Sequence, residues 1–404
     1  MTSNTRVVVI GAGLAGVRLA RRLGELGTPA LLVGEEEHRP YNRVLLAEVL
    51  AGRYAPEVIA LPAPAGLVRT RVTGIDRAAR RLRCADGSLI AYGTLVLATG
   101  SNPVLPPLRG LFTPDRRLPE GVHAFRTMDD CLGLSKAVRP GARAVVVGGG
   151  LLGVSAARAL AARGAQVVLA QQAERLMERQ LDPNASRLVL RHLRDLGVEV
   201  HTECRVRDVR CVGGAVRSVE LADGYALDAD LVVLSCGVHP RTGLAEQAGL
   251  AVRKGVVVDD ELRTSDPHIH AIGDCAQHDG TVYGLAAPAL EQAEALAALL
   301  AGDPAARYSG TRSLTRLTLT GPDSPFDLAA FGETEPLPGD DVVQLADATR
   351  GTYRKVVVRD DRLVGGVLVG ELGTVGALAR AWEGAEPLPG EGPLLHLLTN
   401  DGGS

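Results

Sequence analysis

Short apolar runs that lead through glycines into helical patterns occur twice along the chain. Val7–Ile10 is apolar and β-branched, as in a buried parallel strand, and apolar residues recur at helical spacing over Val17–Leu26. The same order returns at Arg143–Val147 and Val154–Arg163, with an offset of 137 residues. This offset is too long for a solenoid repeat and predicts a duplicated α/β domain.

Each strand runs into a G-x-G-x-x-G turn, Gly11-Ala12-Gly13-Leu14-Ala15-Gly16 in the first copy and Gly148-Gly149-Gly150-Leu151-Leu152-Gly153 in the second. In such a turn the first glycine permits the tight bend, the second lets the backbone approach a pyrophosphate, and the third lets helix and strand pack closely. Glu35 follows the predicted strand Ala30–Val33, 24 residues after Gly11, where a carboxylate can bind a ribose diol. The two copies predict two dinucleotide sites, or one flavin site and one nicotinamide site.

Between and after these motifs the chain alternates predicted strands, helices and Pro-rich connections. Thr94–Gly100 and Leu231–Gly237 are similar apolar strands that end in small residues, and residues 101–107 and 114–119 are Pro-rich, as in a crossover between domains. The other predicted elements are strands at Val68–Ile75, Arg81–Cys84, Val167–Ala170 and His268–Asp274, a hairpin turn at Asp86-Gly87, and helices at Arg187–Leu196 and Pro288–Leu300.

From Ser313 onward the pattern changes to short alternating strands. They are predicted at Leu314–Leu319, Tyr353–Val358 and Leu363–Val369, with a turn at Asp360-Asp361 between the last two. This pattern predicts a third, smaller α+β domain. Residues 391–404 are predicted to form a frayed tail.

The composition is that of an ordinary globular protein. Of 404 residues, 46% are hydrophobic and 23% are charged, so long disordered regions are not expected. A net charge of −3, with 3% aromatic residues and no basic run, argues against nucleic acid as a partner. Apolar runs are too short for a membrane span and the first strand begins almost at once, so we predict a cytoplasmic protein without a signal peptide.

The six cysteines show no pattern of metal binding or disulfide chemistry. They form no CxxC or CxxxxC pair, and no histidine joins them at metal-ligand spacing. We therefore predict no metal site and no iron–sulfur centre. Reduced cysteines in strand-like segments, such as Cys84, Cys204 and Cys236, are expected to act as small apolar residues.

Several motifs together resemble one family. GAGLAG, HRPYNRVLL, LVLATGS, VVGGGLLG, RLMERQLDP, AIGDCA, YGLAAPALEQA and YRKVVVRDDRLVGGVLVG follow one another in the family's order. The sequence resembles the FAD- and NAD(P)H-dependent oxidoreductases of the glutathione-reductase superfamily, and most nearly the rubredoxin/ferredoxin reductases and the flavin-bearing front part of assimilatory NAD(P)H nitrite reductase large subunits. The resemblance implies an α/β fold with two Rossmann-like domains and a small C-terminal α+β domain. The FAD domain would comprise residues 1–115 and 239–308, the inserted NAD(P)H domain 116–238, and the C-terminal domain 309–404.

The resemblance also implies the residues of both sites. Glu35 would bind the adenosine ribose of FAD, Asp274 its ribityl chain, and the helix at Pro288 would direct its N-terminus at the flavin N1–C2=O edge, where the reduced flavin is anionic. The implied FAD site comprises Gly11, Gly13, Leu14, Ala15, Gly16, Glu35, Glu36, Arg43, Val72, Ala98, Thr99, Gly100, Gly273, Asp274, Ala287 and Pro288. The implied NADH or NADPH site comprises Gly148, Gly150, Leu151, Leu152, Gly153, Gln171, Arg175 and Gly237.

The sequence departs from this family at its reactive positions. The cysteines of the disulfide reductases are missing from the stretch after Arg43, so thiol–disulfide exchange is set aside. Relatives carry Lys at the position of Glu48 and Glu at the position of Ser155, so their usual ion pair cannot form here. We predict that Glu48 is a polar group near flavin N5; the alternative is a solvated helix residue.

The second fingerprint lacks the acid that binds an NADH ribose. The predicted strand ends in Gln171-Gln172, and Arg175 follows four residues after Gln171, near the expected place of a 2′-phosphate. Both NADH and NADPH therefore remain open. We favour NADH because only one arginine is available.

The predicted function is that of a flavoprotein NAD(P)H reductase, monomeric or homodimeric, which passes electrons to a separate redox protein. By resemblance the acceptor is a nitrite/nitrate reductase component, a ferredoxin or a rubredoxin. Three alternatives stay open at this stage. They are an NAD(P)H oxidase or small-molecule flavin reductase, a biosynthetic flavoenzyme that acts on a metabolite, and a non-enzymatic flavin-binding or redox-sensing module.

Overall fold

The first domain is organised around a five-stranded parallel sheet. The computed structural model describes residues 6–62, 66–312, 314–319, 326–347, 349–384, 388 and 398–399. The strand order is β19-β7-β1-β2-β3, with every pair parallel. The strands are β1 (Val7–Ile10), β2 (Ala30–Gly34), β3 (Val68–Arg69), β7 (Thr94–Leu97) and β19 (Ile269–Ala271). Because β19 comes from far along the chain, the intervening segment is inserted between β7 and β19.

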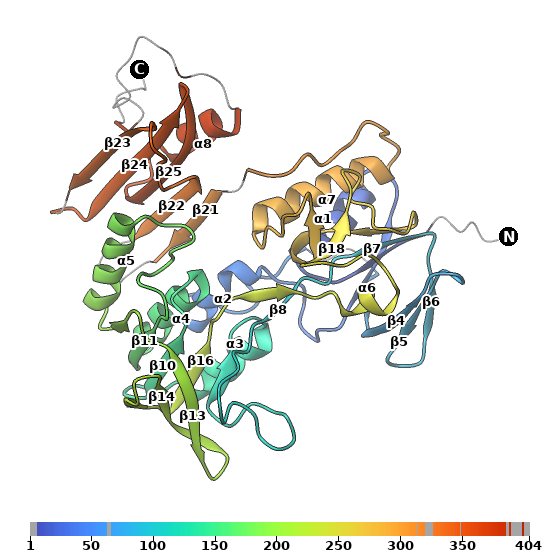
Figure 1. Cartoon of the computed structure of the whole chain (residues 1–404). Coiled ribbons are helices and arrows are strands. Elements are labelled where there is room, and N and C mark those ends of the chain that lie inside the picture. Colours follow the sequence, from blue (N-terminus) through green and yellow to red (C-terminus); the bar gives the residue numbers. More distant parts are fainter. Residues whose placement is uncertain are drawn as a thin grey trace.

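Two long helices pack together beside this sheet, α1 (Leu14–Glu25) and α7 (Ala286–Leu300) (Figure 1). The predicted strand Val68–Ile75 is divided in two, because after β3 the chain leaves the parallel sheet and enters an antiparallel one. That sheet consists of β4 (Val72–Asp76), β5 (Arg81–Cys84) and β6 (Leu89–Ala91). Shorter elements of this domain are η1 (Arg43–Leu45), α2 (Leu46–Leu50), α6 (Gly243–Gln247), β18 (Val256–Val258), η2 (Gly273–Cys275) and β20 (Ala276–His278).

The second domain repeats the design with a parallel sheet in the order β12-β11-β10-β16-β9. Its strands are β9 (Val122–Ala124), β10 (Arg143–Val147), β11 (Gln166–Ala170), β12 (Glu199–His201) and β16 (Leu231–Leu234). Its helices are α3 (Met128–Ala137), α4 (Leu151–Ala162) and α5 (Pro183–Asp195). An antiparallel sheet of β13 (Val206–Val212), β14 (Ala215–Leu221) and β15 (Ala226–Asp228) extends from it.

The two passages between these domains pair with each other. On the way out, β8 (Ser101–Pro103) runs antiparallel to β17 (Val238–Pro240) on the way back. After this crossover, Leu108 and Leu111 already pack in the apolar cluster of the second sheet. The inserted domain is thus tied to the first by a two-stranded ribbon.

The third domain is an antiparallel sheet in the order β21-β22-β25-β24-β23 with one helix, α8 (Val375–Gly384). Its strands are β21 (Leu314–Thr318), β22 (Asp327–Gly332), β23 (Asp341–Asp347), β24 (Thr352–Arg359) and β25 (Arg362–Gly370). Asp360 and Asp361 both have positive φ, 49° and 57°, as the predicted tight turn requires. Most of the predicted tail 391–404 lies outside the described residues; Leu398, which is described, is fully buried rather than frayed.

One apolar cluster joins all three domains. It contains Leu50 of α2, Val154 of α4, Val189 of α5 and Val367 of β25. Figure 1 shows the C-terminal sheet beside α5 and the chain after α7 running from the first domain to that sheet. Within the described ranges no helix has the length and apolar character needed to cross a bilayer. The α/β fold class and the three-part arrangement agree with the sequence prediction.

Candidate functional site

The two glycine-rich turns are built alike. Gly11 has φ +116° and Gly148 φ +107°, values that L side chains rarely adopt. A Cβ on Gly11 would lie 2.0 Å from the Ala98 carbonyl oxygen. A Cβ on Gly16 would lie 1.9 Å from the Gly11 oxygen, and one on Gly153 would lie 1.8 Å from the Gly148 oxygen. The first and third glycines are therefore required by the close approach of backbone segments.

The middle glycines face open space instead. Gly13 and Gly150 are the N-caps of α1 and α4, and no described atom lies within 4 Å of a Cβ built on either. Neither helix receives a side-chain cap from the described residues, and neither has an acidic residue in its first turn, where Leu14, Ala15, Leu151 and Leu152 lie. Their first N–H groups are thus available to an anion such as a pyrophosphate.

Helix capping separates these helices from others of the fold. Thr127 and Asp130 form a capping box at the start of α3, and the Asp182 carboxylate accepts from the Ala185 N–H at the start of α5. In contrast α7, like α1 and α4, has no side-chain cap among the described residues and no acid in its first turn, which contains Ala287 and Pro288. Among the helices of ten or more residues whose N-caps are described, α1, α4 and α7 are those without a side-chain cap, and they are the helices that the sequence places at cofactors.

At the end of β2 lie the carboxylates predicted for the adenosine side. Glu35 pairs with Arg241, and its Oε2 lies 3.7 Å from the Arg71 Nε. The Arg241 Nε also donates to the Asn102 Oδ1 at 2.8 Å, which connects this end of the site to the crossover ribbon. Val72, the first residue of β4, is buried and directly follows Arg71 in the sequence.

Glu36 and Arg43 pair with each other. The Tyr41 hydroxyl donates to the Glu36 Oε2 at 2.7 Å and accepts from the Arg43 Nη1 at 2.8 Å. Burial raises the pKa of Tyr41 well above its usual value, so its hydroxyl stays protonated. The guanidinium predicted to meet the cofactor is therefore held in place by two neighbours.

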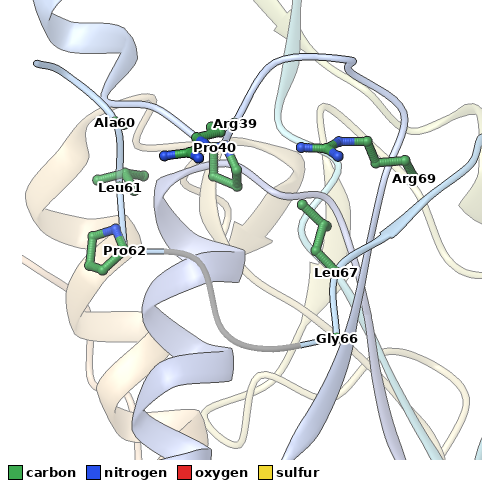
Figure 2. A pocket seen from close by; sticks show the side chains of 8 residues that line it. All are labelled: Arg39, Pro40, Ala60, Leu61, Pro62, Gly66, Leu67 and Arg69. Carbon is green, nitrogen blue, oxygen red and sulfur yellow. The ribbon is translucent and has the colours of Figure 1, made fainter. Parts of the chain in front are cut away.

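A pocket of about 450 Å³ opens beside the same sheet edge. Its walls include Pro40, Leu61 and Leu67, and Figure 2 shows Arg39 and Arg69 at one end of it. Arg69 pairs with Gly34 in the register of β3 and β2, so the pocket adjoins the strand end that carries Glu35. This edge of the first domain therefore combines apolar walls with two guanidinium groups.

Asp274 lies beside the first glycine loop. A Cβ on Gly273 would lie 3.1 Å from the Ala15 Cβ, and the Gly273 N–H donates to the buried Gln292 Oε1 of α7 at 2.7 Å. The Asp274 Oδ2 accepts from the Ser101 Oγ at 2.8 Å and from the Arg126 Nη2 at 2.6 Å. Sequence reasoning missed Arg126, which stands outside every motif, and Ser101, which ends the LVLATGS motif.

The small residues at the strand ends also come together with the loops. The Thr99 Oγ1 donates to the Arg241 carbonyl at 2.8 Å, and the Arg241 N–H donates to the Gly100 carbonyl at 2.9 Å. In the second copy the corresponding Gly237 has φ +101° and its carbonyl accepts from the Val104 N–H at 2.9 Å. The ends of β7 and β16 therefore lead directly into the crossover strands β8 and β17.

Glu48 makes an ion pair that joins two domains. Its Oε1 lies 2.7 Å from the Nη2 of Arg158 on α4, and Arg53 pairs with its other oxygen. The Glu48 side chain is 18% exposed and that of Arg158 only 2%. Burial lowers the pKa of Arg158, and the Glu48 charge opposes this effect. Glu48 is therefore not the solvated helix residue of the alternative prediction.

Ser155, which stands where the resemblance implies a glutamate, donates its Oγ hydrogen within its own helix to the Leu151 carbonyl at 2.8 Å. One helical turn later Arg158 supplies the cation, so the charges are reversed across the two helices: acid on α2, base on α4. No sequence pattern predicts Arg158 as the partner of Glu48. The burial of Arg158 follows only from the tertiary structure.

The end of β11 is organised around Gly149 of the second loop. The Gln171 Oε1 accepts from the Gly149 N–H at 2.8 Å, and the Met177 N–H donates to the Gly149 carbonyl at 2.9 Å. The Gln171 Nε2 lies 3.4 Å from the Arg175 carbonyl. The Arg175 Nη2 forms an ion pair of 2.9 Å with Glu335, which follows β22 in the C-terminal domain. The amide and the guanidinium predicted to meet the coenzyme thus already have partners.

All six cysteines lie in the described part of the chain and none is in a disulfide. Cys131 of α3 packs against α2, with its Sγ 3.4 Å from the Leu46 carbonyl oxygen. Burial raises the pKa of Cys131 and of Cys236 to about 11. Neither thiol is ionised at neutral pH, so neither has the thiolate character of a redox-active cysteine.

Two Rossmann-like cradles, joined by a paired crossover and followed by a smaller antiparallel domain, define a dinucleotide-dependent oxidoreductase fold. Residues 5–293 match the model of the pyridine nucleotide-disulphide oxidoreductases, and residues 319–383 match the C-terminal domain of rubredoxin NAD+ reductase. The chain belongs to the pyridine nucleotide-disulphide oxidoreductase family. Membership implies a flavin and NAD(P)H as cofactors, and the predicted resemblance is confirmed.

Relatives of the chain are electron-transfer reductases. It is 34% identical to the assimilatory nitrate reductase electron transfer subunit of Bacillus subtilis over 379 residues, which are 91% of this chain and 48% of that protein. It is 32% identical to the probable ferredoxin reductase CtmF of Castellaniella defragrans over 388 residues, 90% of both chains. The chain spans less than half the length of the nitrate and nitrite reductase relatives that it matches.

Solved structures show the same architecture. The ferredoxin reductase for the CYP199A2 system of Rhodopseudomonas palustris superposes with a TM-score of 0.80 at 30% identity, covering 91% of each chain. The reductase in the covalent putidaredoxin reductase–putidaredoxin complex gives a TM-score of 0.85 at 26% identity, covering 98% of this chain and 99% of that one. The whole described arrangement, including the C-terminal domain, is thus an established one.

Proposed function

We propose that the first cradle binds FAD, that the second binds NAD(P)H, and that the protein transfers electrons from the nicotinamide to a separate redox protein. The observation that carries this proposal is the set of open helix N-termini. The helices α1, α4 and α7 begin without side-chain caps among the described residues, whereas α3 and α5 are capped. Uncapped N–H groups at two glycine turns suit two pyrophosphates, and a third set suits an anionic flavin edge.

The residues of the first domain fit the parts of FAD. The N-terminus of α1 at Gly13 would hold the pyrophosphate, Glu35 the adenosine ribose and Asp274 the ribityl chain. Arg126 and Ser101 hold the Asp274 carboxylate in one position through contacts of 2.6 and 2.8 Å. Bound FAD would supply the hydride acceptor and the electron relay, which no side chain can provide.

The contact between α2 and α4 would position the nicotinamide. Glu48 belongs to the flavin domain and Arg158 to the nicotinamide domain, so their buried pair fixes the two cradles relative to each other. We assign Glu48 as a positioning residue that also places negative charge at the flavin edge. Because Arg158 neutralises part of this charge, the pair would tune the local field at the flavin.

The proposed acceptor is a one-electron redox protein: a nitrite/nitrate reductase component, a ferredoxin or a rubredoxin. Support comes from relatives that carry such names, the assimilatory nitrate reductase electron transfer subunit and the probable ferredoxin reductase CtmF. The raised pKa values of Cys131 and Cys236 also favour this reading, because thiols near the cradles that remain protonated do not compete for the electrons.

Two glycine variants test the cradles separately. A Cβ at either middle glycine meets no described atom within 4 Å, so we expect Gly13→Val and Gly150→Val to fold, yet each side chain would occupy the space left for a pyrophosphate. We expect Gly13→Val to be colourless. We expect Gly150→Val to be yellow and to be bleached by dithionite but not by NADH or NADPH under anaerobic conditions.

Wild-type protein, reconstituted with FAD, should be bleached by one of the nicotinamides and reoxidised by a candidate acceptor. A wild-type protein that takes up no flavin, or a Gly150→Val variant reduced by NADH as fast as the wild type, would refute the proposal. Fast aerobic NADH turnover without any protein partner would instead assign the chain to the oxidases.

A further inference from the structure

A contact from the C-terminal domain reaches the loop beside the second cradle. The Glu335 Oε1 lies 2.9 Å from the Arg175 Nη2. Arg175 lies on the segment that follows β11, and Glu335 lies on the segment between β22 and β23. A domain that contains neither glycine turn therefore supplies an acid to the nucleotide side of the molecule.

Arg175 is held next to the glycine turn. The segment that carries it is attached at both ends to Gly149, through the Gln171 Oε1 at 2.8 Å and the Met177 N–H at 2.9 Å. The Arg175 carbonyl lies 3.4 Å from the Gln171 Nε2. Because Gln171 occupies the strand-end position that faces an adenosine ribose, the Arg175 side chain starts beside the place of that ribose.

Glu335 is also held in place. The preceding carbonyl, that of Thr334, accepts from the Lys355 Nζ at 2.8 Å, and Lys355 forms a buried ion pair of 3.0 Å with Asp182, the N-cap of α5. Before it, the Glu333 N–H donates to the Val364 carbonyl at 3.0 Å. The carboxylate of Glu335 thus projects from an anchored backbone, and its side chain remains 56% exposed.

We propose that Glu335 makes this site select NADH over NADPH, an inference that rests on the proposed binding of NAD(P)H at the second cradle. The two coenzymes differ only by a 2′-phosphate on the adenosine ribose, and an arginine past the strand end is the usual group that accommodates it. Glu335 forms an ion pair with Arg175, the arginine at this position, and adds a negative charge beside it. A 2′-phosphate would have to displace a carboxylate and then lie next to it, whereas NADH makes no such demand.

The test compares fragments that differ only in the 2′-phosphate. Binding of 5′-AMP and of 2′,5′-ADP to the FAD-loaded protein is measured by isothermal titration calorimetry at low salt, with Glu335→Gln, Arg175→Gln and the double variant. Glu371→Gln is the matched control, because Glu371 is a similarly exposed acid of the same domain that pairs with Arg354 at 2.5 Å.

Glu335→Gln should bind 2′,5′-ADP about tenfold more tightly than the wild type and 5′-AMP within about twofold. Adding Arg175→Gln should abolish the gain, and Glu371→Gln should show none. The ratio of kcat/KM for NADPH to that for NADH should rise in parallel. Unchanged 2′,5′-ADP affinity in Glu335→Gln, or an equal gain in Glu371→Gln, would overturn this inference but not the proposed nucleotide site. Failure of the wild type to bind 5′-AMP would overturn the proposed nucleotide site and the inference with it.

Discussion

Replacing Lys355 by methionine should destabilise the attachment of the C-terminal domain. The Lys355 Nζ lies 3.0 Å from the Asp182 Oδ2, and the two side chains are 8% and 1% exposed. The Tyr353 hydroxyl donates to the same oxygen at 2.6 Å. Methionine preserves the length of the side chain but leaves the carboxylate without its cation. Removing one partner of a buried ion pair costs about 3–5 kcal/mol, because the other charge stays buried.

A double-mutant cycle separates the ion pair from its surroundings. Asp182→Asn keeps an N-cap acceptor for α5, since asparagine caps helices as well as aspartate does, but leaves Lys355 without a counter-charge. In Lys355→Met/Asp182→Asn neither charge remains. We therefore expect the double variant to be more stable than the sum of the two single losses predicts, by about 2 kcal/mol or more.

The single tryptophan makes the assay specific. Trp382 lies on α8, packs against Phe331 at 5.2 Å between ring centroids, and is 7% exposed. Its fluorescence in a denaturant titration therefore reports the C-terminal domain, which matters because a chain of three domains does not unfold in one two-state step. Single variants that each lose less than about 1 kcal/mol, or strictly additive losses, would refute the reasoning.

Three further predictions concern other parts of the chain. Glu48→Gln leaves the buried Arg158 charge less compensated, so the flavin midpoint potential should rise by about 30 mV. The rate of flavin reduction in anaerobic stopped-flow experiments should also change. If potential and rate are both unchanged, Glu48 has no part in the mechanism. Gly16→Ala should lower the Tm, since its Cβ would lie 1.9 Å from the Gly11 carbonyl oxygen and helix and turn would have to move apart; an unchanged Tm in a circular dichroism melt would contradict this. Hydrogen bonds from Arg143 lower the pKa of Asp230 from 3.8 to about 2, so the stabilisation by Asp230 is complete above about pH 4 and is lost as the pH falls through 2. The Tm difference between wild type and Asp230→Asn should therefore be larger at pH 7 than at pH 2, and an equal difference at both values would show that the charge is irrelevant.

The sequence predicted those parts of the fold that local chemistry determines. Both strand–glycine–helix units were predicted at β1–α1 and β10–α4, because each glycine spacing answers a local steric need. The capping box of Thr127 and Asp130 marks the start of α3, a helix that is absent from the sequence prediction although this local signal is present. The strand β23 gave little signal, since nearly all of its residues are exposed and its pattern does not alternate.

Contacts between distant segments could not be predicted in this way. Arg126 meets Asp274 across 148 positions of the chain, and Arg158 meets Glu48 across 110. Each arginine stands in an ordinary sequence context, and only the packing of the domains gives it a partner. Helix propensity and strand alternation carry no information on such pairs, so the reversed ion pair and the orientation of the Asp274 carboxylate had to come from the structure.

The distribution of buried charge explains how three domains can hold one geometry. The apolar cluster that includes Leu50, Val154, Val189 and Val367 is continuous across all three, so it supplies the cohesion of the interface. Apolar contact alone does not select one register, since side chains of similar volume can repack. Buried ion pairs such as that between Glu48 and Arg158 contribute little net stability but penalise every arrangement in which a charge loses its partner. The pair between Asp182 and Lys355 acts in the same way on the third domain. The apolar core would therefore set the distance over which a hydride passes between the cradles. The ion pairs at the edges of that core would set the alignment of the two cradles.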